Sequence, residues 1–379
     1  MVEKKCDVLI VGGGPAGLAT AIALRQRGAD VLLADALAPP IDKACGEGIL
    51  PDSRRDLGRL GVELPDACGA RFHGIRFSGQ RFSVAAEFPS EPGLGVKRTV
   101  LHQLLADRAA EAGVRLAWNT SVSVNPGQPI ALDSEPVRYR YLIGADGQSS
   151  RVRTWAGLDD GSLLTRRFGF RIHYRIAPSI TQRPRPHVEV HWTVGGQVYV
   201  TPVAENELCV SVMAASSDAV RGRQMVGTIP GLKQQLAGAE IITRERGGIT
   251  TTRRLRSVTR GKVALVGDAS GSADAITGEG LAMSFRQALL LAEAIDAGDL
   301  SLYESVHPTI MRLPQTMARI LLLMDRWPAL RDRALRVLAH DPALFQALVC
   351  VHIGEKPLRH FIMRQAPSLG FRLLMPLSA

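Results

Sequence analysis

A run of glycines directly after an apolar segment is the part of this chain best suited to hold a charged ligand. Residues 6–11 (CDVLIV) are followed by residues 12–17 (GGGPAG). Gly12 permits a tight turn, Gly14 lets the backbone approach a pyrophosphate, and Gly17 allows the next helix to lie close to the strand. The start of that helix offers free N–H groups and the positive end of its dipole to phosphates. This spacing predicts a dinucleotide site.

Acidic residues at the ends of other predicted strands extend this site. Residues 30–34 (DVLLA) read as a buried strand, and Asp35 follows it where a ribose-binding carboxylate is expected. Asp146 and Asp268 each come directly after another apolar strand, in the segments GADG and GDASG. Ligands of open α/β sheets bind at the carboxyl ends of the strands. We therefore expect these three carboxylates to converge on one ligand.

The elements that must position these residues fall into three groups. Up to about residue 155, buried strands alternate with helices predicted over residues 52–60 and 99–112. Residues 168–213 alternate between apolar and polar side chains, as an antiparallel sheet with one wet face does, with turns at residues 195–196 and 205–206. A helix over residues 280–297 and a helical tail follow. Prolines predict breaks in that tail at Pro314, Pro328, Pro342 and Pro357.

Composition narrows the class of protein. Of the 379 residues, 46% are hydrophobic, which is enough for a large core in two or three structural units. The five cysteines are scattered and form no C-x-x-C pair, so we expect reduced thiols in a cytoplasmic protein. The nine histidines show no metal-ligand spacing, so we expect no metal site.

Charge is concentrated in the C-terminal part. The formal net charge is +10, and residues 301–379 hold ten Lys/Arg against five Asp/Glu. This tail has no zinc finger, no aromatic RNA-binding pattern and no continuous basic run, so nucleic acid is not an expected partner. Residues 358–379 interleave arginines with Phe, Ile, Leu and Met, which predicts a peripheral contact with a membrane surface. An ordinary solvated helical face is the alternative.

The three glycine-rich and acidic segments, in this order, resemble the FAD-dependent oxidoreductase superfamily that contains aromatic-ring hydroxylases (class A flavin monooxygenases), flavin halogenases and geranylgeranyl reductases. The resemblance covers about residues 5–300. It implies an α/β fold with a Rossmann-like FAD-binding domain (residues 1–72, 98–155 and 250–300). An antiparallel β-sheet substrate domain (residues 73–97 and 156–249) is inserted into it, and a C-terminal helical region (residues 301–379) follows.

The same resemblance assigns the cofactor site. The glycine loop would hold the FAD pyrophosphate, Asp35 the adenosine ribose and Asp268 the ribityl chain, while Arg98 would reach the flavin side. The helix that starts at residues 278–280 would face the pyrimidine ring of the flavin. The implied FAD-binding residues are Gly12, Gly14, Pro15, Ala16, Gly17, Asp35, Cys45, Gly46, Arg98, Asp146, Asp268, Gly278 and Gly280.

The reaction stays open between branches of the superfamily. Residues 43–48 (KACGEG) and 267–280 resemble the reductases, whereas residues 199–202 (YVTP) lack the tryptophan of their substrate motif. Because these departures fall in the substrate motif, the sequence favours a monooxygenase. It would act on a hydrophobic, aromatic or lipid-like small molecule through a flavin C4a-hydroperoxide. The alternatives are a geranylgeranyl-reductase-like enzyme that reduces C=C bonds of a prenyl substrate, and a flavoprotein partner or maturation factor without turnover.

Cys45 and Glu47 are the candidate catalytic residues. The Cys45 thiol would donate a proton or form an adduct with the flavin, and Glu47 would supply a proton if it were buried in its protonated form. Each also has a plain structural interpretation, as a small residue in a tight loop and as a carboxylate bonded to backbone. The chain has no second G-x-G-x-x-G segment. We therefore expect electrons from NAD(P)H that docks transiently, or from a separate reductase.

Overall fold

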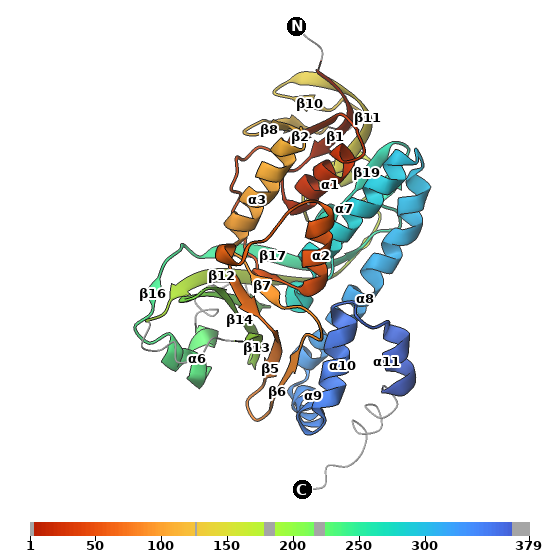
Figure 1. Ribbon diagram of the computed structural model, residues 1–379. Helices are drawn as coiled ribbons and strands as arrows, with labels where there is room; N and C mark the ends of the chain where they lie inside the picture. Colours follow the sequence, from red (N-terminus) through yellow and green to blue (C-terminus); the bar gives the residue numbers. More distant parts are fainter. Residues whose placement is uncertain (1–3, 126, 178–185, 216–223, 366–379) are drawn as a thin grey trace.

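The strand that precedes the glycine cluster lies at the centre of a mainly parallel sheet. The computed structural model describes residues 4–125, 127–177, 186–215 and 224–365. Figure 1 shows this sheet at the N-terminal end of the molecule. Its strands are, in spatial order, β18 (Thr259–Arg260), β19 (Val263–Leu265), β11 (Glu135–Gly144), β1 (Lys4–Val11), β2 (Val31–Ala34) and β8 (Arg115–Ala117), with β10 (Ala131–Leu132) paired to β11 and β9 (Val122–Ser123) to β10.

Side chains on both faces of β1 are apolar, as expected for a parallel strand that is covered on each side. Val8 and Ile10 belong to the core that the sheet shares with three helices, α1 (Pro15–Arg25), α3 (Arg98–Glu111) and α7 (Gly280–Asp296). Leu9 and Val11 point to the opposite core, with residues of β10 and of α4 (Arg151–Trp155). The predicted helices over residues 99–112 and 280–297 are confirmed within one residue at each end.

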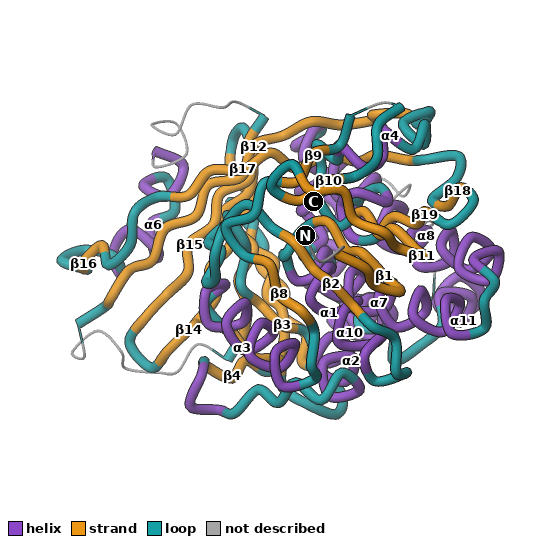
Figure 2. Tube along the Cα trace, turned by 90° about the horizontal axis from the view of Figure 1, so that it is seen from above, coloured by secondary structure: helices purple, strands orange, loops and turns teal. Residues whose placement is uncertain are grey.

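A second, mostly antiparallel sheet is inserted into this domain. The turns predicted at residues 195–196 and 205–206 are confirmed by the pairing of its strands. In spatial order these are β16 (Glu240–Ile241), β12 (Ser162–Arg175), β15 (Glu207–Ala214), β14 (Gly196–Ala204), β13 (His187–Thr193), β5 (Gly74–Ser78) and β6 (Ser83–Glu87), with β17 (Arg246–Arg254) on β12. The boundary expected between residues 249 and 250 lies inside β17. The two sheets lie side by side in Figure 2.

Short elements connect the two sheets. A small antiparallel sheet places β7 (Gly93–Gly95) between β3 (Gly48–Ile49) and β4 (Ala70–Phe72). The helix α2 (Pro51–Arg59), predicted over residues 52–60, contacts α7. A short helix, α6 (Pro230–Gln235), packs on the outer side of the second sheet. Residues 45–47, directly before β3, contact β12 and β15 of the second sheet.

The C-terminal region is helical, and one predicted break is wrong. The helix α8 (Leu300–Arg326) continues through Pro314, although a proline inside a helix removes a hydrogen bond and costs roughly 3 kcal/mol. Its buried side chains recur every three or four residues, at His307, Met311, Gln315 and Ala318, so packing of one face outweighs this cost. The other three breaks are confirmed, because Pro328, Pro342 and Pro357 start or precede α9 (Pro328–His340), α10 (Pro342–His352) and α11 (Leu358–Arg364).

The tail helices pack onto the second sheet. A single core joins α8, α9 and α10 to β5, β6 and β13, and Figure 1 shows α9 and α10 beside β5 and β6. Within the residues that the structure describes, no one helix has both the length and the apolar composition to cross a bilayer. The pair α9 and α10, bent by 104° at its junction, meets those two criteria together.

Candidate active site

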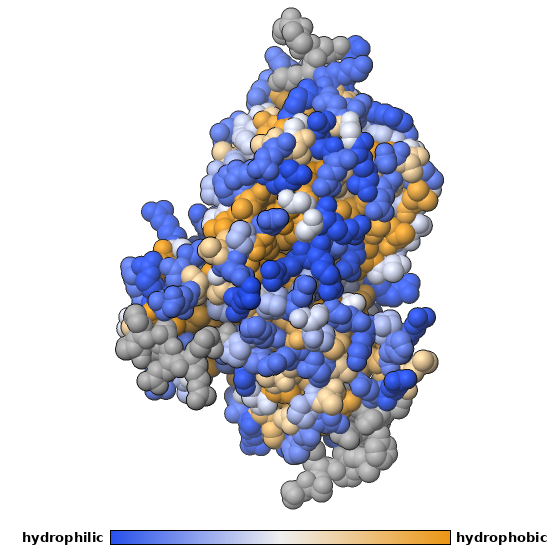
Figure 3. Space-filling view, in the orientation of Figure 1, coloured by the Kyte–Doolittle hydropathy of each residue, from blue (hydrophilic) through white to orange (hydrophobic). Residues whose placement is uncertain are grey.

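A single large cavity joins the two sheets and the tail helices. Its volume is about 1000 Å³. One end is lined by the glycine loop and the strand ends of the first sheet, and the other by side chains of the second sheet and of α8 to α11. In Figure 3 the apolar atoms on the visible face gather at mid-height over α3, α7 and α8. We call the first end the cradle and the second end the apolar chamber.

The glycine loop has the geometry that its spacing predicts. Gly12 has a φ of +111°, and a Cβ atom there would lie 2.4 Å from the Ala145 carbonyl oxygen. Gly14 is different, because a Cβ atom there would meet no heavy atom within 4 Å, and its open side is part of the cavity lining. Gly14 is also the N-cap of α1 and makes no side-chain cap. The first N–H groups of α1 are therefore available to a phosphate.

Carboxylates at the strand ends shape the cradle. Asp35 lines it and accepts a hydrogen bond from the Gly13 N–H at 2.6 Å. Asp146 also lines it and accepts hydrogen bonds from the N–H groups of Arg151 (2.7 Å) and Val152 (3.1 Å), so this carboxylate fixes the start of α4. Asp268 lies 3.6 Å from the Lys43 ammonium group. All three carboxylates predicted to converge do line the same cavity.

The start of α7 forms another part of the cavity lining. Gly278 and Gly280 both line the cavity, and a Cβ atom at either position would meet no heavy atom within 4 Å. The N-cap of α7, Glu279, makes no side-chain cap. Two helix N-termini thus border one cavity, and both favour negative charge.

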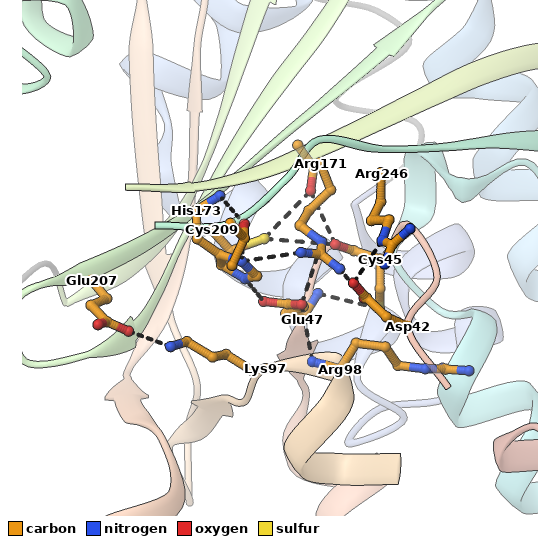
Figure 4. A network of polar contacts seen from close by, with 12 residues as sticks. Asp42, Cys45, Glu47, Lys97, Arg98, Arg171, His173, Glu207, Cys209 and Arg246 are labelled. Atoms are coloured by element: carbon orange, nitrogen blue, oxygen red, sulfur yellow. Dashed lines mark hydrogen bonds and ion pairs between the residues drawn. The ribbon is translucent and has the colours of Figure 1, made fainter. Parts of the chain in front are cut away.

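Arg98 gives the cradle a buried positive charge. Its side chain is mostly buried and lines the cavity, and its Nε atom has no hydrogen-bond partner among the described residues. Burial lowers the pKa of this guanidinium group. In Figure 4 its head points away from the contacts around Glu47. An unpartnered buried donor, two helix N-termini and an open glycine together fit an elongated anionic ligand, as the two phosphates of FAD require.

Glu47 anchors the loop that carries Cys45 (Figure 4). It has a φ of 60°, which is uncommon for a residue with a side chain, and is only 2% exposed. Its carboxylate accepts hydrogen bonds from the Arg98 N–H (3.0 Å) and from His173 Nε2 (2.6 Å). Arg171 donates to His173 Nδ1 at 3.1 Å, so Nε2 carries the ring proton. Both Glu47 oxygens therefore act as acceptors, which favours anchoring, while its role as a proton source stays a prediction.

The network continues to the surface through Arg171. This arginine donates to Asp42, which in turn accepts from Arg246 at 2.9 Å. The contacts join the loop of residues 42–47 to β12 and β17 of the second sheet. Buried paired charges of this kind hold a loop in one arrangement when every member has a partner.

Cys45 lies at the border between cradle and apolar chamber. It is half-buried and lines the cavity beside Gly46. Burial raises the pKa of its thiol, with Arg98 opposing, and burial also raises the pKa of Cys209 well above its usual range. The Cys45 carbonyl accepts a hydrogen bond from Ser211 at 3.1 Å. At neutral pH both thiols are protonated, which suits a proton donor better than a nucleophile.

The apolar chamber is built from elements that are far apart in the chain. Tyr199 is its largest polar side chain, and its hydroxyl donates to the Ile276 carbonyl at 2.8 Å. Burial raises the pKa of Tyr199 far above its usual range. The apolar lining residues are Leu50, Phe72, Ile75, Phe77, Val188, Val190, Met213, Ile249, Ala273, Met283, Met317, Ile320, Leu321, Met324, Leu338, Phe345, Leu348, Val349 and Phe361.

Several residues of the site had no signal in the sequence. His102 is fully buried and its Nε2 bonds the Gly13 carbonyl at 2.8 Å, which fixes the glycine loop from α3. Asn119 lines the cavity with a φ of 53°. Asn tolerates this conformation better than most residues, and that preference was the one available clue. Asp42 and Arg171 come together only through the fold.

Within the described chain, one group of potential metal ligands stands out. Glu47, His173 and Cys209 have ligand atoms within 4.8 Å of one another. The Glu47 and His173 atoms are already hydrogen-bonded to each other at 2.6 Å. This direct contact leaves no position for an ion between them.

Sequence comparison identifies the family. The FAD binding domain family matches residues 5–298. A menaquinone reductase of Mycolicibacterium smegmatis is 28% identical over 82% of this chain and 81% of its own. A digeranylgeranylglycerophospholipid reductase of Methanosarcina acetivorans is 26% identical over 78% of this chain and 77% of its own. Both relatives are similar along most of their length.

Solved structures show the same fold at low sequence identity. A flavoprotein/dehydrogenase from Cytophaga hutchinsonii has a TM-score of 0.80 and 18% identity, covering 98% of both chains. The flavin-dependent brominase Bmp2 has a TM-score of 0.70 and 17% identity, covering 93% of this chain and all of its own. The cradle, the inserted sheet and the match over residues 5–298 agree: the chain belongs to the FAD binding domain family and is an FAD-dependent oxidoreductase.

Proposed function

We propose that this protein reduces carbon–carbon double bonds in the prenyl-like chain of a hydrophobic substrate. The observation that carries the proposal is the continuity of the cavity, which passes from the cradle into the apolar chamber without a dividing wall. The named sequence relatives are reductases, one of menaquinone and one of a digeranylgeranylglycerophospholipid. This proposal takes the second of the two reactions that the sequence left open.

The chamber favours a hydrocarbon over an electron-rich aromatic ring. Each buried CH₂ group contributes about 0.8 kcal/mol to binding, so a long chain gains from the many aliphatic and aromatic side chains around it. A phenol would leave its hydroxyl group in need of a polar partner. The Tyr199 hydroxyl donates to the Ile276 carbonyl, so toward a phenol it would act as an acceptor only. A hydrocarbon chain has no polar group, so it needs no hydrogen-bond partner in the chamber.

Different residues of the site would bind the cofactor, supply a proton and exclude water. The N–H groups of the glycine loop and of α1 would bind the pyrophosphate of FAD, Asp35 would bind a ribose, and Arg98 would offset negative charge. FAD, when bound, supplies hydride chemistry. The protonated thiol of Cys45 offers one source of a proton beside the chamber, and Glu47 would hold the Cys45 loop against β12. The apolar chamber would exclude water from the reacting carbons.

Oxygenation is the second candidate, and one observation favours it. Residues 199–202 line or border the chamber without the tryptophan of the reductases' substrate motif. A monooxygenase of this fold would insert an oxygen atom into the same hydrophobic substrate. The two reactions share a cradle and differ in the fate of the reduced cofactor.

Product analysis separates the two reactions. The FAD-loaded protein is reduced in the absence of oxygen and mixed with a geranylgeranyl lipid. The molecular mass of the product is then measured by mass spectrometry. The proposal expects a gain of two hydrogen atoms per double bond in the absence of oxygen. A product that gains an oxygen atom, formed in air only, would establish the second candidate and refute the first. Repeating the assay with NADH, NADPH or a reduced ferredoxin as donor identifies the electron source.

A peripheral membrane contact would bring such a substrate to the chamber. On α11, Ile362 is 53% and Met363 is 70% exposed, and Arg359 and Arg364 flank them. Phe361, their neighbour, lines the chamber. The rest of the predicted membrane segment, residues 366–379, lies outside the described residues. Co-sedimentation with anionic vesicles tests the contact, and an Ile362→Ser, Met363→Ser double variant that still sediments would refute it.

A further inference from the structure

A second, smaller cavity lies beside the apolar chamber. Its volume is about 130 Å³, and its polar lining residues include Asp52, Glu279, Arg286 and His352. Met283 and His352 line this cavity and the apolar chamber alike. His352 is therefore the one titratable side chain, among the described residues, that borders both spaces.

Glu279 is turned away from the cradle into the small cavity. Its neighbours Gly278 and Gly280 line the cradle, whereas the Glu279 side chain lines the small cavity and is 7% exposed. Its Oε2 atom has no hydrogen-bond partner among the described residues. The same atom lies 3.6 Å from His352 Nδ1. A small rotation of either side chain converts this approach into a hydrogen bond.

Charged groups connect the cavity to the surface. Arg286 is 44% exposed, and its guanidinium lies 3.6 Å from an Asp52 oxygen and 3.7 Å from an Asp56 oxygen. Arg59 approaches Asp56 at 3.6 Å from the same helix, α2. The tail helix α8 contributes Thr309 and the apolar residues Ile310, Leu313 and Pro314 to the lining. The groups thus run from solvent at Arg286 to the chamber at His352.

The protonation states of Glu279 and His352 place a proton donor beside a proton acceptor. Burial, followed by the negative charge of Asp52, raises the pKa of Glu279 to about 8. Burial lowers the pKa of His352, although Asp52 opposes it. Burial also raises the pKa of Asp52. Near neutral pH, Glu279 holds a proton and the His352 ring is uncharged.

We propose that Glu279 and His352 form a proton relay that carries protons from the small cavity into the apolar chamber. The inference rests on the proposed reduction, which consumes one proton for each double bond. In that reaction the carbon–carbon π bond breaks, and a hydride from the reduced cofactor and a proton form two C–H bonds. One nitrogen of His352 releases its proton to the chamber while Nδ1 takes the proton of Glu279. Solvent then returns a proton to Glu279, and rotation of the neutral ring turns its new N–H group toward the chamber before the next cycle.

Infrared spectroscopy tests the proton on Glu279 without turnover. Full-length protein as purified is titrated while the C=O band of protonated carboxyl groups is recorded. The relay expects a band that disappears on titration through a pKa of about 8 in wild type and is missing in Glu279→Gln. Glu293→Gln, on the same helix with a half-exposed carboxylate, is the matched control and should keep the band. A band that survives in Glu279→Gln overturns the proposal.

Chemical rescue tests the transfer through His352. In single-turnover reduction of a geranylgeranyl lipid, His352→Ala should be slower by about 10²-fold, the lower end of what proton transfer contributes. Added imidazole should restore most of the rate, because it replaces the missing ring. Glu279→Gln should lose the pH dependence near 8. His340→Ala, on the neighbouring helix α9, is the control and should match wild type.

The outcomes separate this relay from the proposed function. A wild-type protein that reduces no prenyl lipid removes the proposed function, and the infrared titration still decides whether Glu279 holds a proton. If wild type is active, a slow His352→Ala variant that imidazole does not rescue shows a structural role and overturns the relay. A His352→Ala variant with the wild-type rate overturns it as well.

Discussion

The cradle and the apolar chamber share one cavity but are built in different ways. The cradle is made mostly of backbone groups and strand-end carboxylates from short, contiguous segments such as residues 12–17. The chamber is made of side chains from the second sheet and from tail helices more than two hundred residues away. Backbone geometry leaves little freedom, so the cofactor is fixed. Side-chain lining varies easily, so under the proposed function this half would select the substrate.

The largest expected effect concerns the backbone of the cradle. Gly12→Ala would place a Cβ atom 2.4 Å from the Ala145 carbonyl oxygen at a φ of +111°. We expect a loss of about 3 kcal/mol or more in the free energy of unfolding. Gly14→Ala should fold normally, because no heavy atom lies within 4 Å, yet bind FAD weakly, since its methyl group enters the cradle. Thermal melts and FAD titration measure both; two equally stable variants would contradict this account.

The buried Glu279 carboxyl group, at the start of α7, should make stability depend on pH. The pKa of Glu279 rises from 4.5 in the unfolded chain to about 8 in the fold. Between these values the folded protein binds more protons than the unfolded chain, so the free energy of unfolding falls as pH rises. Glu279→Gln removes this penalty, and its advantage over wild type should grow by roughly 4–5 kcal/mol from about pH 4 to about pH 9. Urea unfolding at several pH values measures it. A constant difference would contradict the burial of an ionisable Glu279.

The buried charge of the cradle should act on cofactor affinity. Arg98→Met keeps the length of the side chain and removes its unpartnered donor. We expect FAD to bind about 10- to 100-fold more weakly, the range for one charge-assisted hydrogen bond. Lys97→Met, whose ammonium pairs with Glu207 outside the cavity, is the matched control. Equal FAD affinity in both variants would show that Arg98 does not contact the cofactor.

The smallest expected effect lies in the chamber. Leu321→Trp adds volume to its lining and should raise the KM for a long prenyl chain about tenfold relative to a short one, because a few CH₂ groups lose their place. FAD affinity should stay unchanged. Leu323→Trp, on the exposed side of α8, is the control and should show no preference for chain length. A change in FAD affinity in Leu321→Trp would contradict the separation of cofactor binding in the cradle from substrate binding in the chamber.

The cradle could be predicted from the sequence because each of its parts has a local cause. Gly12 is required by its own φ, and Asp35 and Asp268 follow strands whose apolar pattern is visible in the chain. The same holds for the alternation that predicted the second sheet. Local sterics and periodicity determine these features, so no knowledge of distant contacts is needed.

The rest of the site depends on contacts between distant residues. Glu47 contacts His173, which lies 126 residues later in the chain, and the sequence near either residue does not predict this contact. Pro314 misled the prediction in the other direction. Its strong local preference predicted a break, but the packing of α8 keeps the helix continuous there. Tertiary packing decides which apolar side chains of a helix face a cavity and which form ordinary core.

The proline inside α8 leaves a gap in the helix where the small cavity lies. Pro314 has no N–H group, so the Ile310 carbonyl lacks its usual helical donor, and both residues line that cavity. The Ile310 carbonyl is thus an acceptor without its helical donor, in a residue that borders the same space as Glu279. Two polar partners in a space of about 130 Å³ suit a chain of hydrogen-bonded water. We therefore expect Pro314, which removes a backbone hydrogen bond of α8, to favour water beside the buried Glu279.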